Sequence, residues 1–282
     1  MSDTNSPITG GPVLLADLSS PETAALLPGI EIVLIPVGAH EQHGPNIAVS
    51  TDTVSAESLC QAAAAIAGSH VAVAPAIPWG ISWHHMRFPG TITLRPETLT
   101  AILEDIVTSL HAHDVQRFLF VNGHGGNSAV IATACEEIKQ FTGAEVVASI
   151  FGYALIEEEA RKRLPASGIG HGGADEAAVV MAVMPQRGKP QAATGPDIVD
   201  AMPESQALLA QYGGILARPY HERTRNGVTG DARTATPELG QEILAAAGAR
   251  LAEIIEVLLR EARAAEASAA RAADSQRGAG PG

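Results

Sequence analysis

Apolar and polar residues follow two rhythms along this chain, short apolar runs and longer segments with a helical period. The short runs are apolar at nearly every position and rich in β-branched residues, which is typical of strands covered on both faces. The longer segments repeat their apolar positions every three or four residues, as amphipathic helices do. The predicted strands are 32–37, 71–74, 118–121 and 146–150, and the predicted helices are 54–67, 97–111, 128–141, 174–183 and 237–261.

Alternation of strands and helices predicts an α/β fold, a three-layer α/β/α sandwich around a mostly parallel central sheet. A chain of 282 residues can form one such core, so we expect a single domain over 1–268. The final helix should pack on the sheet through its apolar face. Beyond it, residues 269–282 contain no large apolar side chains, and we expect a disordered tail there.

The segment 185–230 lacks both rhythms and consists largely of Pro, Gly and polar residues. It is too long for an ordinary connection within a compact domain. We therefore expect either a loop that covers a site or an arm that contacts another subunit.

Charge and composition exclude several classes of partner. The chain has 18 Lys and Arg against 31 Asp and Glu, a formal charge of -13. Such a field repels nucleic acid backbones and anionic membrane surfaces. The first residues lack the basic stretch and apolar core of a signal peptide, and no apolar run could span a bilayer, so we expect a cytoplasmic protein. Cys60 and Cys135 belong to no CxxC pair and are expected to be reduced thiols.

Glu41, His43 and Asp52 follow the first predicted strand. Ligands of open α/β sheets bind at the carboxyl ends of strands, and Glu41 and His43, two residues apart, can point to the same side of an extended backbone. In the alternative interpretation Asp52 only caps the next helix, and the other two are solvated loop residues. The HExxH zinc motif is excluded, because His40 and His43 are three residues apart in a loop containing Gly and Pro.

Two further loops offer similar groups. His124 lies in NGHGGN after the strand at 118–121, where the alternative is a tight turn with an incidental histidine. No nucleotide-binding glycine motif is present there. His171 and Glu176 lie at the start of the helix at 174–183, where Glu176 could merely favour the helix N-terminus.

Together these loops predict a metal site, because they should converge at one edge of the sheet. Two imidazoles and three carboxylates suit one or two divalent ions such as Zn²⁺, Mn²⁺ or Fe²⁺. The expected metal ligands are Glu41, His43, Asp52, His124 and Glu176. Such ions polarise an amide carbonyl and activate water, and the remaining His171 would move the proton to the leaving nitrogen. His84 and His85 either line the pocket or pack at the surface.

The segments VGAHEQHGPNIAVSTD, NGHGGN and HGGADE, together with FPGTITLRPETL and GVTGDARTATPELG, resemble the creatininase family. The resemblance implies a three-layer α/β/α fold, a centre of one or two metal ions and commonly a hexamer. It also implies that Glu41, His43, Asp52 and His124 are metal ligands, with Asp52 bridging, and that His171 transfers protons.

Two departures from the family pattern concern the substrate and the last ligand. Gly125 and Gly126 stand where true creatininases have an aromatic residue and a glutamate, which disfavours creatinine and leaves Glu176 as the remaining ligand. Ala177 and Ala178 replace a frequent Thr-Ser pair, which would deprive Glu176 of hydroxyl partners. The glycine version also resembles peptidases that trim mycofactocin precursor peptides and deformylases that open formamide intermediates.

We therefore expect a metal-dependent amidohydrolase acting on a small-molecule, non-standard amide C–N bond: a cyclic amide, a formamide or a small peptide-like substrate. The alternatives are a mycofactocin-type precursor peptide peptidase and a non-catalytic member of the fold that binds metal or ligand. A purely structural protein would leave the loop histidines unexplained.

Overall fold

A parallel sheet forms the centre of the molecule. The computed structural model describes residues 11–200 and 203–278. The strands are β1 (Val13–Leu14), β2 (Ile32–Val37), β3 (Val71–Val73), β4 (Arg117–Asn122) and β5 (Val146–Phe151), in the order β1-β3-β2-β4-β5. All four strand pairs are parallel, as predicted.

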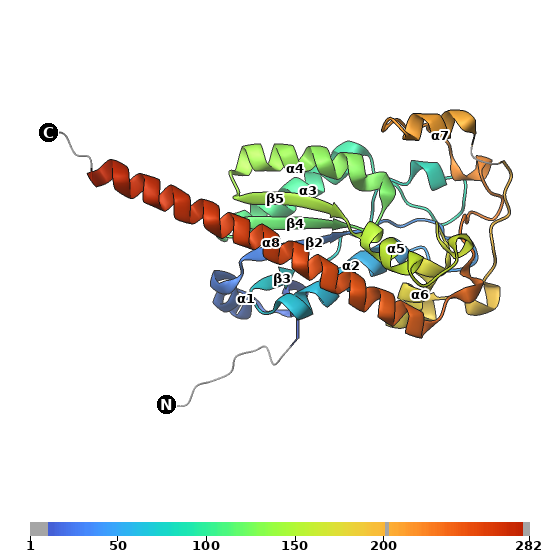
Figure 1. The fold of residues 1–282 in the computed structure, drawn as a ribbon, viewed down its shortest axis with the longest axis horizontal. Coiled ribbons are helices and arrows are strands. Elements are labelled where there is room, and N and C mark those ends of the chain that lie inside the picture. The colour runs from blue at the N-terminus through green and yellow to red at the C-terminus, as the bar shows by residue number, and fades with distance from the viewer. Residues whose placement is uncertain (1–10, 201–202, 279–282) are drawn as a thin grey trace.

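Helices cover both faces of this sheet (Figure 1). One face packs against α2 (Thr51–Ala67), α5 (Gly152–Arg161), α6 (Ala174–Val183) and α8 (Pro237–Gly278). The other packs against α3 (Pro96–His111) and α4 (Ser128–Thr142). All six residues of β2 are buried, because both faces of the strand are covered. Each large apolar side chain buried in this way contributes about 1.5–3 kcal/mol. The predicted three-layer α/β/α sandwich is confirmed.

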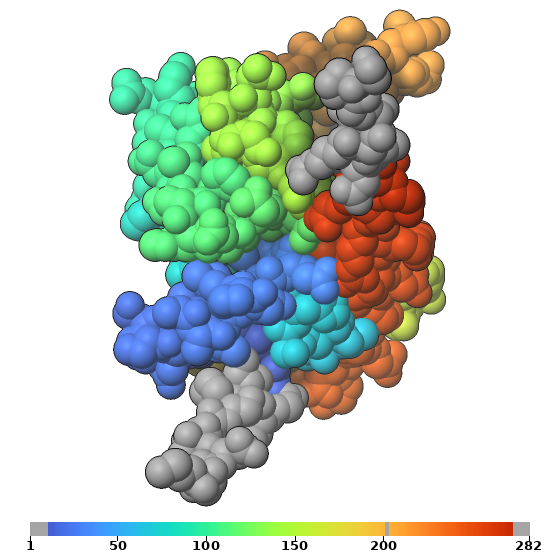
Figure 2. All heavy atoms as spheres, turned by 90° about the vertical axis from the view of Figure 1, so that its left-hand side faces the viewer, coloured from blue at the N-terminus to red at the C-terminus, as the bar shows by residue number. Residues whose placement is uncertain are grey.

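Strand order and register bring distant loops together. β2 pairs with β4 so that Val37 lies opposite Asn122, and Asn122 in turn lies opposite Phe151 of β5. The strands therefore end at the same edge, and the loops that follow β2 and β4 are neighbours. Figure 2 views the molecule from the other end, where the strands begin and where the blue N-terminal elements and the red helix α8 reach the surface.

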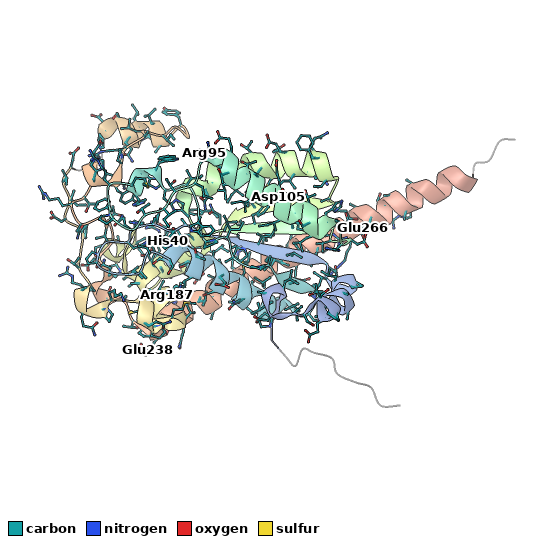
Figure 3. The ribbon with its side chains drawn as sticks, turned by 180° about the vertical axis from the view of Figure 1, so that it is seen from behind. His40, Arg95, Asp105, Arg187, Glu238 and Glu266 are labelled. Carbon is teal, nitrogen blue, oxygen red and sulfur yellow. The ribbon has the colours of Figure 1, made fainter. Side chains whose placement is uncertain are left out.

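Helix α8 is longer than predicted. It continues to Gly278, through the first ten residues of the expected disordered tail, and residues 279–282 lie outside the described residues. Alanine is the strongest helix former, which explains a helix without large apolar residues. Arg263 also pairs with Glu31 at 2.6 Å, and Glu266 pairs with Arg117 at the end of the molecule remote from His40 (Figure 3). The domain boundary at residue 268 stays a prediction.

Three helices were not predicted: α1 (Ser20–Leu26), α5 and α7 (Glu204–Ala210). α1 and α7 have only seven residues each, too few for a clear period, and α7 lies in the segment expected to be irregular. α5 directly follows β5, with Gly152 as its first residue, and was not recognised from the sequence. Among the residues that the structure describes, none of the helices is both long and apolar enough to cross a bilayer.

Candidate metal centre

All six predicted site residues meet at the carboxyl edge of the sheet. Glu41 and His43 lie in the loop after β2, His124 lies two residues after the end of β4, and His171 and Glu176 flank the start of α6. Asp52 is the second residue of α2, and Ser50 is its N-cap, so the alternative interpretation in which Asp52 only caps this helix is wrong. The carboxylate lies within the first helical turn instead, with only 4% of its surface exposed.

His43 faces two of the carboxylates. Its Nδ1 lies 3.0 Å from the Glu41 backbone carbonyl, to which it can donate its ring proton. The other nitrogen, Nε2, then has its lone pair free and lies 3.2 Å from Asp52 Oδ1 and 3.6 Å from Glu176 Oε2. This orientation is the one that a metal-binding histidine requires, with the far nitrogen held by a backbone acceptor.

His124 faces the other side of the same aspartate. Its Nδ1 lies 3.3 Å from Glu41 Oε1 and 3.3 Å from Asp52 Oδ2. The two carboxylate oxygens of Asp52 are therefore directed at different imidazoles, His43 and His124. A carboxylate in this position can bridge two neighbouring ions.

The donor set fits a divalent metal. His43 Nε2 and Asp52 Oδ2 are buried and make no hydrogen bond, an arrangement that is costly unless another partner binds them. Among the described residues, groups of three ligand atoms within 4.8 Å of one another occur in four combinations. These are Glu41/His43/Asp52, Glu41/His84/His124, Glu41/His85/His171 and His43/His171/Glu176. Oxygen and nitrogen donors of this kind suit Zn²⁺, Mn²⁺ or Fe²⁺.

Burial and the attraction between imidazoles and carboxylates shift the pKa values of these groups in opposite directions. Burial disfavours the charged form of His43, but Glu176 and Asp52 outweigh it and raise the pKa of His43 to about 10. Burial likewise opposes ionisation of Asp52, yet His43 and His124 hold the pKa of Asp52 well below its usual value. Burial raises the pKa of Glu176 far above its usual range. Without a cation, protons neutralise part of this cluster.

Hydrogen bonds hold the carboxylates in place. The Ser82 hydroxyl donates to Glu41 Oε2 at 2.7 Å, and the backbone N–H of Gly172 donates to Glu176 Oε2 at 2.6 Å. Asn127 ties two loops together, donating to the Gly38 carbonyl at 2.9 Å and accepting from the Ile81 N–H at 2.9 Å. Sequence reasoning missed Ser82, for which no local pattern gave a signal. Asn127, the last residue of NGHGGN, lay in a segment already singled out.

His171 differs from the other two imidazoles in its surroundings. Its Nε2 lies 2.6 Å from the Gln42 carbonyl, and its Nδ1 lies 3.6 Å from Glu41 Oε1. Burial, with the neighbouring His43, lowers the pKa of His171 to about 3, so the ring is neutral. A neutral ring that donates from Nε2 to Gln42 keeps Nδ1 as a proton acceptor facing the site.

A cavity of about 400 Å³ opens onto these groups. His84 and His85 line it, which confirms the first of the two interpretations of this pair. His85 Nε2 is 3.4 Å from Glu41 Oε1, so this histidine is a further candidate ligand. Tyr220 and Arg223 line the cavity too, and the segment 185–230 therefore covers the site, one of the two roles expected for it.

The departures from the family pattern have local structural consequences. At Gly126 a Cβ would lie 2.4 Å from His124 Nε2, whereas at Gly125 the nearest contact would be 3.9 Å away. Ala177 and Ala178 are both buried, and Ala177 belongs to a small apolar cluster with Val54 and Val180. Neither alanine can donate a hydroxyl hydrogen bond to Glu176. The Gly172 N–H donates a hydrogen bond to the Glu176 carboxylate instead.

Comparisons with known proteins agree with the fold and the motifs. The mycofactocin precursor peptide peptidase of Mycobacterium tuberculosis is 36% identical over 129 residues, covering 43% of this chain and 51% of that protein. The chain thus matches about half the length of this relative. The creatinine amidohydrolase of Pseudomonas putida is 27% identical over 233 residues, covering 76% of this chain and 84% of that protein.

Solved structures share the fold over nearly their whole length. A crystal structure of creatinine amidohydrolase (creatininase) superposes with a TM-score of 0.75 at 24% identity, covering 88% of this chain and 98% of that one. A structure described as "Creatininase Mn" gives a TM-score of 0.75 at 23% identity. Residues 16–255 match the family described as Creatininase, creatinine amidohydrolase. Because this match covers most of the chain, the protein belongs to the creatininase family.

Proposed function

We propose that the protein is a metal-dependent amidohydrolase that hydrolyses a non-standard amide C–N bond in a small molecule. The observation that carries the proposal is the pair of buried imidazoles directed at opposite oxygens of Asp52. Such an arrangement has a large desolvation cost without a cation, and hydrolytic metal sites provide the cation.

The ligand assignment follows from the distances. His43, Asp52 and Glu176 would hold one divalent ion, and Glu41, Asp52 and His124 would hold a second. When bound, the ions would polarise the amide carbonyl and lower the pKa of water toward neutrality. Zn²⁺, Mn²⁺ and Fe²⁺ are the expected metals.

The protein's own residues hold the ligand carboxylates and move the proton. Ser82 holds Glu41 in a fixed position, and the Gly172 N–H does the same for Glu176. His171 presents Nδ1 toward the site and can take a proton there and return it to the leaving nitrogen. Glu176 combines its ligand role with a position next to the reacting groups.

The first experiment combines metal analysis with turnover on a panel of cyclic amides, formamides and short peptides. We expect about one to two divalent ions per chain and hydrolysis that a chelator abolishes and metal restores. Bound metal without turnover of any amide would favour the non-catalytic alternative. Absence of metal after reconstitution with Zn²⁺, Mn²⁺ and Fe²⁺ would refute the proposal.

A paired variant separates proton transfer from metal binding. His171→Ala should keep its metal and lose about 10²–10⁴-fold in rate, whereas His124→Ala should lose metal as well. Metal content and turnover are measured on the same preparations. Since His171 also belongs to two of the candidate ligand groups, equal loss of metal in both variants would make it a ligand.

A second candidate is a peptidase acting on a precursor peptide of the mycofactocin type. It is favoured by the 36% identity over 129 residues to the M. tuberculosis peptidase. Cleavage of a peptide in place of small amides on the same panel would select it. The metal centre and His171 would have the same roles in either reaction.

We further propose a homo-oligomer, with a hexamer as the expected form, that acts in the cytoplasm. Exposed apolar residues of 204–216 support the first point, and the two free cysteines support the second. A monomeric mass in solution at micromolar concentration would contradict the oligomer, and localisation of a tagged chain in cells tests the compartment.

A further inference from the structure

A series of ring contacts connects Arg223 to the metal centre. The Arg223 guanidinium carbon lies 4.3 Å from the centroid of the Tyr220 ring. The Tyr220 ring in turn lies 4.0 Å from the His85 ring and 4.8 Å from the His171 ring. One ring, that of Tyr220, therefore lies between Arg223 and the histidine that we propose as the proton carrier, and Arg223 lines the same cavity.

Arg223 differs from the neighbouring arginines of its segment. Arg225 pairs with Asp197 at 2.8 Å, and Arg218 pairs with Asp200 at 2.7 Å. Over residues 11–200 and 203–278, the ion pairs include none between Arg223 and a carboxylate. The stacked guanidinium thus retains hydrogen-bond donors for another partner.

The lining of the cavity makes Arg223 chemically distinct. Among the described lining residues it is the only Arg or Lys, and the lining includes four carboxylates. Three of these, Glu41, Asp52 and Glu176, belong to the proposed metal centre. The fourth, Glu157, pairs with Arg161 outside the lining. The cavity therefore has one cationic position that its own carboxylates do not neutralise.

The backbone around Arg223 is held firmly. Its N–H donates to the Tyr220 carbonyl at 2.9 Å, and its carbonyl accepts from the Val199 N–H at 2.9 Å. The next residue, Thr224, is fully buried. Stacking on Tyr220 limits the side chain further. A cation held in this way loses little conformational freedom when it binds a ligand.

We propose that Arg223 binds a free carboxylate of the substrate, so that the hydrolysed amide belongs to an N-acylated amino acid or a related amide-containing acid. This inference rests on the proposed amidohydrolase function. A guanidinium matches a carboxylate with two parallel hydrogen bonds, which a single arginine can supply. A phosphate would bring a second negative charge toward the pocket's carboxylates, and no second cation lines the described cavity.

The experiment compares matched substrates on matched variants. N-formylalanine and N-formylalaninamide differ only in the carboxylate, and formate release measures their hydrolysis. Arg223→Gln should raise KM for the acid about 10- to 100-fold with kcat nearly unchanged, because a charge-assisted hydrogen bond is lost. The amide should be unaffected. Arg223→Lys should restore part of the loss, and Arg225→Gln, which alters an exposed pair on the same segment, should behave as wild type.

Measuring carboxylate binding tests the role of Arg223 even if the enzyme hydrolyses neither compound. Calorimetry on the metal-loaded protein uses butyrate and the neutral n-butanol as probes. We expect butyrate to bind wild type more tightly than Arg223→Gln by a similar factor, and n-butanol to show no difference. Failure of hydrolysis across the whole amide panel, with this binding pattern, would overturn the amidohydrolase proposal alone. Equal butyrate affinity in both proteins, or equal losses for the acid and the amide substrate, would overturn the role of Arg223.

Discussion

The ligand loops (residues 38–52, 123–127 and 168–176) and the α7 arm (residues 204–216) invert the usual distribution of polar and apolar groups in opposite ways. In the ligand loops charged groups are buried, with Glu41 1%, His43 0% and Asp52 4% exposed. In the α7 arm apolar groups are exposed, with Tyr212 at 84% and Ile215 at 86%. Figure 1 shows α7 set apart from the layers of the sandwich.

Each inversion indicates a different kind of missing partner. Buried carboxylates and imidazoles have lost the water that would solvate them, and not all of their polar atoms form hydrogen bonds. A bound cation can compensate for this loss. Exposed apolar side chains that gather in one segment lose nothing in the isolated chain, but they gain by contact with another surface. We therefore propose that the ligand loops hold the chemistry and that the α7 arm contacts another subunit.

The largest expected effect is at the residue shared by both proposed ions. Asp52→Ala should remove the bound metal and abolish activity, because it deletes both the oxygen that faces His43 and the oxygen that faces His124. The fold should persist, since the side chain is not part of the apolar core. Elemental analysis and turnover test this, with circular dichroism as the control for folding. Retained metal and turnover would remove Asp52 from the centre.

Two adjacent glycines offer a matched pair with a smaller effect. Gly126→Ala places a Cβ 2.2 Å from the Ile81 carbonyl and 2.4 Å from His124 Nε2, so it should displace His124 and lower activity by about 10²-fold. Gly125→Ala meets nothing closer than Phe151 at 3.9 Å and should stay near wild type. Turnover and metal content are measured for both variants. Similar behaviour of the two would show that the close contacts at Gly126 do not control the geometry of the site.

The smallest effect is expected in the α7 arm. Ile215→Ser should leave metal content and turnover unchanged and alter the free energy of unfolding by no more than about 0.5 kcal/mol, because the side chain is 86% exposed. Denaturant unfolding and metal analysis check this. A loss of metal in this variant would mean that the arm supports the ligand loops and that the two regions are not independent.

Prediction from sequence succeeded where local pattern and chemistry coincide. The bounds of β2 and α6 match the predicted ranges, because each is a continuous apolar run or helix with a clear start. The six site residues were found because histidines and carboxylates stood at strand ends and at a helix start. Prediction failed for α7, whose seven residues are too few for a clear period. It also failed for the length of α8, which extends past residue 261 through an alanine-rich stretch and through ion pairs of Arg263 and Glu266.

The sequence by itself determined the alternating elements, the three-layer fold and the residues that could bind metal, since periodicity and residue type are local properties. Only the tertiary structure decided which atoms face each other. Asp52 directs its two oxygens at different histidines, Ser82 holds Glu41 across 41 residues of chain, and Arg223 joins the cavity from a segment without regular pattern. Such contacts depend on strand order and loop paths, and these depend on the packing of the whole chain.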